Sequence, residues 1–206
     1  VNDGTTTFQD NLTATTTTIT TGTGNFNTVS GTTISDIVFN GAGTANLYAD
    51  LTGNVTTTAN NQGTLTTTGL SQTITGNIGS SVSSDLNTLN IGSSTTSTNY
   101  SVTTINGNVY SNSTVLNNNG TTNSSELILA SGNNITSSIS TADAYMGILT
   151  LSGGTQTVTG QVGTSTENLA QINSGANGAN STFVNDVYAV NVTNTGNGTT
   201  TFQNDV

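Results

Sequence analysis

Hydrophobic and polar residues alternate over short stretches of this chain. In "GTANLYADLTGNV", Leu47, Ala49 and Leu51 share one side of an extended strand, while Tyr48 and Asp50 share the other. Such segments are about 4–6 residues long and are bounded by Gly, Asn or Ser. No window of about 12 residues or more carries the apolar stripe of a helix. The pattern therefore predicts an all-β protein with short strands.

The alternation is organised in a repeating phrase, Gly-Thr-x-x-apolar. The phrase occurs as "GTTTF", "GTGNF" and "GTANL", and "GTTTF" returns close to the C-terminus. Its apolar anchors are Phe8, Phe26, Leu47 and Phe202, and less regular copies are anchored by Leu65, Leu127, Leu149 and Ile172. From Phe8 to Leu65, successive anchors are 18, 21 and 18 residues apart. This spacing suits one coil of a β-solenoid and is too short for a tandem globular domain.

A longer unit contains the short phrase. "GTLTTTGLSQTITGNIG" (63–79) matches "GILTLSGGTQTVTGQVG" (147–163) without a gap, and with small gaps the match extends over 63–110 and 147–188. Segment 4–12 likewise resembles 198–206. We therefore expect Phe8 and Phe202 to lie in the same core stripe. Matching end coils indicate a chain cut from a longer array or one whose ends join copies.

These patterns predict one domain over residues 1–206, a right-handed parallel β-helix of about ten coils. Threonine favours strands, asparagine and glycine provide left-handed backbone at corners, and stacked Thr or Asn can form ladders between coils. The absence of proline fits strands that pair on both sides. One or two antiparallel β-sandwiches are the alternative, because they too use short strands and polar turns.

Composition excludes several function classes. The chain has no Lys, Arg, His or Cys, and ten carboxylates give a net charge of −10. Nucleophilic triads, Cys-His pairs and phosphate clamps cannot be built from these residues. Nucleic-acid binding requires cations, and no segment approaches the apolar length of a membrane helix. We therefore expect no catalytic residue, no cofactor, no nucleic-acid partner and no membrane insertion.

Calcium is the one ligand for which the chain offers candidate residues. Acidic extracellular repeats bind calcium through oxygen ligands, although neither the calcium-solenoid nonapeptide nor an EF-hand loop is present. The four candidates follow apolar anchors at similar places: Asp10, Asp50, Asp186 and Asp205. The alternative is that these aspartates occupy ordinary turns.

The phrases "GILTLSGGTQTVTGQVG" and "DVYA" (186–189), together with the Gly-Thr-x-x-apolar coils, resemble the passenger region of rickettsial surface cell antigens of the outer membrane protein B type. The resemblance covers most of the chain and is loose over 93–144. It implies a secreted autotransporter passenger that acts as an adhesin or coat on a bacterial surface. The chain departs from that family by lacking every Lys and Arg.

Taken together, the sequence predicts an extracellular or cell-surface structural and adhesive rod without catalysis. Its expected partners are copies of itself and a surface protein or glycan of a host or neighbouring cell. Five tyrosines could stack on sugars or cover coil edges: Tyr48, Tyr100, Tyr110, Tyr145 and Tyr188. A filament or surface-layer subunit joined head to tail is the second hypothesis. A solenoid that cleaves polysaccharides with a carboxylate pair is the third.

Overall fold

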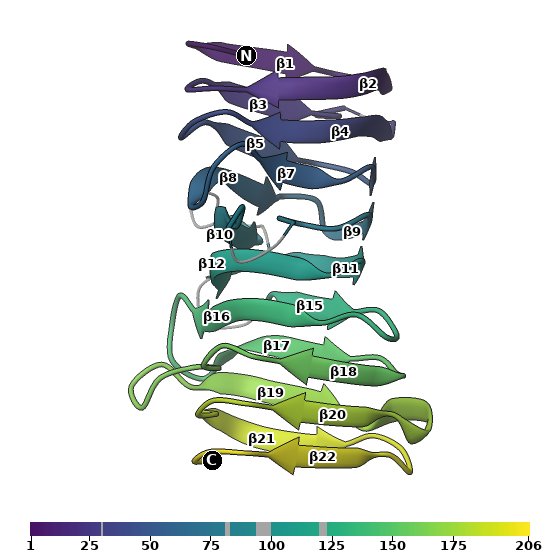
Figure 1. The fold of residues 1–206 in the computed structure, drawn as a ribbon, viewed down its shortest axis with the longest axis vertical. Coiled ribbons are helices and arrows are strands. Elements are labelled where there is room, and N and C mark those ends of the chain that lie inside the picture. Colours follow the sequence, from purple (N-terminus) through teal and green to yellow (C-terminus); the bar gives the residue numbers. More distant parts are fainter. Residues whose placement is uncertain (30, 81–82, 94–99, 120–122) are drawn as a thin grey trace.

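Strands from successive passes of the chain pair in parallel and form one stack, with the two termini at opposite ends (Figure 1). The structure is a computed structural model, and it describes residues 1–29, 31–80, 83–93, 100–119 and 123–206. Two ten-stranded parallel sheets run along the stack. The predicted parallel β-helix is confirmed, and the antiparallel sandwich is wrong. Among the described strands, only β13 (Asn118–Asn119) and β14 (Asn123–Ser124) pair antiparallel.

The strands of the two sheets alternate along the chain. The first sheet contains β1 (Thr5–Phe8), β3 (Thr23–Phe26), β5 (Thr44–Leu47), β8 (Gln62–Thr67), β10 (Leu86–Ile91), β12 (Val109–Leu116), β16 (Ile135–Thr141), β18 (Thr155–Val158), β20 (Asn180–Phe183) and β22 (Thr199–Phe202). The second contains β2 (Leu12–Ile19), β4 (Thr33–Phe39), β6 (Leu51–Thr52), β7 (Val55–Thr57), β9 (Ser71–Thr75), β11 (Val102–Asn106), β15 (Glu126–Leu129), β17 (Met146–Leu151), β19 (Leu169–Ser174) and β21 (Ala189–Asn194). A single 3₁₀ turn, Ala176–Gly178, completes the described secondary structure.

Each coil contributes to three columns of paired residues, here called columns A, B and C in chain order. Column A begins with β1, β3, β5, β8 and β10, column B contains β6, β9, β11, β15, β17, β19 and β21, and column C contains β7, β18, β20 and β22. Longer strands span two columns. In β4, residues 33–34 pair with β6 in column B, and residues 37–39 pair with β7 in column C. β2 does the same, while β12 and β16 span columns C and A. The first sheet thus passes from column A to column C, so its ten strands form fewer than the ten coils expected.

The repeating phrase has a simple structural meaning. In β5, Thr44 and Asn46 point outward and are half-buried, whereas Ala45 and Leu47 are buried. The same order holds in β3, where the third position is Gly24 and the anchor is Phe26. Gly-Thr-x-x-apolar therefore encodes a corner, two outward polar side chains, a small inward residue and a core anchor.

The buried apolar side chains form one cluster that extends from the first coils to the last. Leu127, Leu149 and Ile172 are stacked in register in column B and are fully buried. Polar residues also enter the interior. Thr103 donates a hydrogen bond to Thr67 at 2.9 Å, and both hydroxyls are buried. Because inward hydroxyls bond across coils, a chain with only 31% hydrophobic residues can still fill its interior.

The long repeat is out of phase with the coils by one column. Segment 63–79 runs through columns A, B and C as β8, β9 and Ile78. Segment 147–163 runs through columns B, C and A as β17, β18 and Val162. One contact is nevertheless kept: a Cβ at Gly79 would overlap the carbonyl oxygen of Tyr110, and one at Gly163 would overlap that of Tyr188. The same phrase can therefore form adjacent sides of the same solenoid.

Phe8 and Phe202 do not lie in the same core stripe, so that expectation is wrong. Phe8 pairs with Phe26 in column A, and their rings stack at 5.3 Å. Phe202 pairs with Phe183 in column C, and their rings also stack at 5.3 Å. The two "GTTTF" copies differ in column because the chain does not complete a whole number of coils between them.

Candidate functional site

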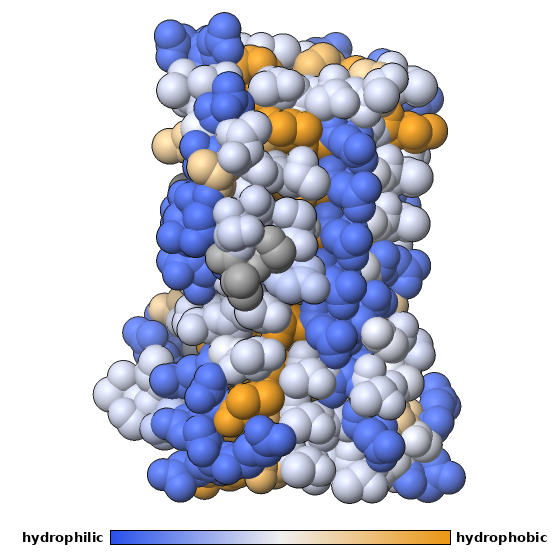
Figure 2. Space-filling model, viewed as in Figure 1, coloured by the Kyte–Doolittle hydropathy of each residue, from blue (hydrophilic) through white to orange (hydrophobic). Residues whose placement is uncertain are grey.

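A ladder of side-chain oxygens runs along column C. In each rung, a side-chain oxygen accepts the backbone N–H of the residue one coil further on. The rungs join Asp36 to Asn54 (2.7 Å), Asn54 to Asn77 (2.9 Å), Asn77 to Asn108 (2.8 Å), Asn108 to Asn134 (2.8 Å) and Asn134 to Thr157 (2.8 Å). A hydrophilic stripe follows the same side of the stack past β4, β7 and β16 (Figure 2). Because each oxygen is engaged, the planes of these amides are fixed.

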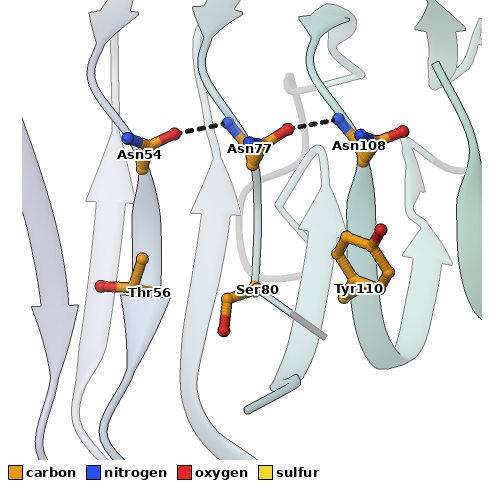
Figure 3. A pocket seen from close by; sticks show the side chains of 7 residues that line it. Asn54, Thr56, Asn77, Ser80, Asn108 and Tyr110 are labelled. Atoms are coloured by element: carbon orange, nitrogen blue, oxygen red, sulfur yellow. Dashed lines mark hydrogen bonds between the residues drawn. The ribbon is translucent and has the colours of Figure 1, made fainter. Parts of the chain in front are cut away.

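A second row lies beside the ladder, two residues further along each strand. Thr56, Gly79 and Tyr110 occupy successive positions in this row, as the pairing of Val55, Ile78 and Val109 requires. Gly79 has a φ of +69° and leaves no room for a Cβ beneath Tyr110, so the middle position must lack a side chain. Thr56 and Tyr110 therefore flank a notch at Gly79, and the side chain of the next residue, Ser80, lies between them in Figure 3.

This notch is part of a surface groove of about 280 Å³, here called the Gly79 groove. It is lined by Asn54, Thr56, Asn77, Gly79, Ser80, Asn108 and Tyr110. Among the described residues, none accepts a hydrogen bond from the amide nitrogen of Asn77 or Asn108, or from the hydroxyl of Tyr110. The groove thus offers oriented neutral donors beside one aromatic ring, and no charged residue lines it (Figure 3).

A second groove, of about 330 Å³, lies over column A. Its lining consists of Thr44, Asn46, Thr64, Thr66, Asn90, Gly92, Ser93 and Asn117. Here the amides donate to side chains of the neighbouring coil, because Asn46 donates to Asn25 at 2.9 Å and Asn90 donates to Thr66 at 3.3 Å. This groove contains no aromatic side chain. It is therefore a less complete recognition surface than the Gly79 groove.

The four calcium candidates do not converge. Asp50 accepts the backbone N–H of Thr73 at 2.7 Å, and Asp10 lies at the bend that follows β1. Asp186 and Asp205 do occupy successive coils of one column, because their carbonyls accept the N–H groups of Val162 and Val187. Within the described ranges, no group of three His, Cys, Asp or Glu residues could hold a metal ion. Calcium binding at these aspartates stays a prediction.

One carboxylate is electrostatically unusual. Burial raises the pKa of Asp85, and its Oδ1 is buried without a hydrogen-bond partner. Its backbone N–H donates to the side chain of Asn60 at 3.0 Å. Asp85 lines neither groove. We therefore expect Asp85 to affect the stability of the fold and not binding at either groove.

The five tyrosines are in different environments. Tyr145 is the most exposed, at 66%, and Tyr48 is also exposed. Tyr100, Tyr110 and Tyr188 are half-buried. Of the five, Tyr110 lines the Gly79 groove, and none lines the second groove. The ladder asparagines were not among the residues expected from sequence. Their signal is the phrase Gly-Asn-apolar, which occurs at 53–55, 76–78 and 107–109; the same phrase at 24–26 lies in β3 of column A, outside the ladder.

No family model, curated protein or solved structure matches the chain. The similarity to rickettsial passengers therefore stays a prediction that rests on repeated phrases and composition. Among the described residues, no helix has the length and apolar character needed to span a membrane.

Proposed function

We propose that this protein is an extracellular structural and adhesive rod without catalysis. The observation that supports the proposal is the unbroken column C ladder from Asp36 to Thr157, in which side chains reinforce the backbone pairing between coils. Each additional coil contributes another rung and another core layer, so stiffness and stability accumulate along the axis. The design is suited to spacing, coating or presenting a surface.

Two properties favour an exposed location. The chain has no cysteine and no Lys or Arg, so it needs no redox protection and contains no trypsin-type cleavage site. Its pairing strands bury their backbone hydrogen bonds between neighbouring coils, which limits access of other proteases. An adhesive role would use the uncharged grooves, with a surface protein or a glycan as partner.

Imaging and surface labelling test this proposal together. Electron microscopy of the purified chain is expected to show rods about 4 nm long, the length given by roughly 4.8 Å per coil. Antibodies raised against the chain are expected to label intact cells of the source organism without permeabilisation. Rods that are seen only inside lysed cells would contradict the extracellular role.

The second candidate is a filament or surface-layer subunit that joins head to tail. In the described structure, the outer edges of β1 and β22 pair with no other strand. Val192 of β21 pairs in register with the buried Ile172 of β19 but is itself 38% exposed. Unpaired strand edges are templates for another chain. Filaments that lengthen with protein concentration would favour this candidate over a monomeric rod.

Polysaccharide cleavage is the third candidate, and no observation favours it. It would need two carboxyl groups about 5–10 Å apart beside a bound sugar. Neither groove is lined by a carboxylate. Release of reducing ends from neutral polysaccharides would be its direct assay.

A further inference from the structure

We propose that the Gly79 groove binds a neutral oligosaccharide that lies along the solenoid axis. The inference deepens the adhesive part of the proposed function, on which it rests, and it names the site and the class of ligand. Its evidence is the combination of fixed donors, one aromatic wall and the absence of charge in a single groove.

The donors are held in place before any ligand arrives. Asn77 is anchored by its side-chain oxygen, which accepts the backbone N–H of Asn108, and Asn108 is anchored in the same way by Asn134. The amide nitrogens of Asn77 and Asn108 take no part in these bonds and donate to no described residue, so they remain available to a ligand. Preorganised groups lose little conformational entropy when they bind, so such donors are favourable for recognition.

The spacing of the donors fits a chain of sugar rings. Neighbouring coils are about 4.8 Å apart, which is close to the length of one ring in an extended glycan. Hydroxyls on successive sugars could therefore accept from successive asparagines. The hydroxyls of Thr56 and Ser80 line the same groove and can donate or accept.

Tyr110 supplies the apolar contact that sugars require. Its ring lines the groove, and in Figure 3 the side chain of Ser80 lies between it and Thr56. Sugar rings present C–H faces as well as hydroxyls, and tyrosine combines an apolar ring with a polar tip. The ligand is neutral because the groove has no cation to pair with a carboxylate or sulfate, and the chain's charge of −10 repels anions.

The repeat provides an internal comparison. Gly163 and Tyr188 reproduce the contact of Gly79 and Tyr110, but Gln161 and Asp186 stand in place of the two asparagines. The amide nitrogen of Gln161 donates to the carbonyl of Gly163 at 2.8 Å, so this donor is consumed within the chain. The second position thus has the tyrosine without the free amides, and we expect it not to bind.

Saturation-transfer NMR with cellohexaose, maltohexaose and chitohexaose tests the proposal on the full chain. At least one of these oligosaccharides is expected to receive saturation from the protein with millimolar affinity. Tyr110→Ala should abolish the transfer, whereas Tyr188→Ala should leave it unchanged. Equal loss in both variants, or no transfer from the unchanged chain to any of the three, would overturn the proposal.

A second pair of variants separates recognition from folding. Asn77→Asp keeps the oxygen that accepts the Asn108 N–H, as Asp36 does for Asn54, but removes the free amide donor. We expect it to weaken binding about 2- to 10-fold, the effect of roughly one lost hydrogen bond. Asn134→Asp makes the same change outside the groove and should leave binding unchanged. Equal affinities of the two variants would also overturn the proposal.

Failure of this inference leaves a distinct signature from failure of the rod itself. A chain that forms rods on the cell surface and ignores all three oligosaccharides would retain the proposed function and lose only the site. A chain that binds cellohexaose but is absent from the cell surface would retain the site and lose the proposed function.

Discussion

The side-chain oxygen of Asn77 accepts the backbone N–H of Asn108 at 2.8 Å, although 31 residues of sequence separate them. The side chain of Asn108 repeats the bond with Asn134. An asparagine at this corner thus continues the hydrogen bonding of the sheet at a point where the chain changes direction. The ladder links coils of different length without changing the register of column C.

Replacing one rung should destabilise the stack measurably. Asn108→Ala removes the acceptor for the N–H of Asn134, and we expect a loss of about 1–2 kcal/mol in the free energy of unfolding. Asn108→Asp keeps an accepting oxygen and should cost less than Asn108→Ala. Urea denaturation followed by circular dichroism measures both, and equal losses would show that the rung contributes nothing.

Two glycines should respond differently to alanine. At Gly160, an added Cβ would overlap the carbonyl oxygen of Ser137 in the neighbouring coil, so Gly160→Ala is expected to cost about 3 kcal/mol or more. Gly132 has open space around it but a φ of +78°, so Gly132→Ala should cost only about 1–2 kcal/mol of backbone strain. Thermal melts of the two variants would rank them, and the reverse order would contradict the close approach of the coils.

Core residues of column B should contribute less to the free energy of unfolding in the last coil, β21, than in β17 and β19. Ile172 is fully buried, and Ile172→Ala is expected to cost about 2–5 kcal/mol. Val192 follows it in register but is 38% exposed, so Val192→Ala should cost about 1 kcal/mol or less. Chemical denaturation at several protein concentrations would check this. A large loss at Val192 that appears only at high concentration would instead indicate that a second copy covers it.

Asp85 should make the protein less stable as the pH rises. Burial raises the pKa of its carboxyl in the folded state, so the folded chain binds this proton more tightly than the unfolded chain. The stability linked to protonation is present below the unfolded pKa of about 3.9 and is lost as the pH rises through the folded pKa. Asp85→Asn, which stays neutral, should therefore gain stability over the unchanged chain across that window.

Urea titrations between about pH 3 and pH 7 would measure this difference, starting below the usual aspartate pKa. Asp143→Asn removes a carboxylate from an exposed position and serves as the control. A pH-independent difference between Asp85→Asn and the unchanged chain would contradict the prediction.

The alternation of polar and apolar residues predicts short strands, and the spacing of the Gly-Thr-x-x-apolar phrase predicts the parallel β-helix and its anchors. Leu47, Leu65, Leu127 and Leu149 were expected in the core, and all are buried. Such predictions succeed because every coil must bury its own side chains, so the information is local and repeated. The ladder asparagines were missed because the phrase Gly-Asn-apolar recurs at irregular intervals, and its function depends on a neighbour that the sequence does not identify.

The sequence by itself determined which residues face inward, because alternation along a strand fixes the side on which each side chain lies. It also determined that no charge pair could hold the fold, since it contains no cationic side chain. Only the tertiary structure decided which coil each residue meets. Coil length varies, so the 84-residue offset of the long repeat does not correspond to a whole number of coils. The varying coil lengths likewise placed Phe8 and Phe202 in different columns. The pairing between coils set Tyr110 beside the free amides of Asn77 and Asn108, and Tyr188 beside Gln161.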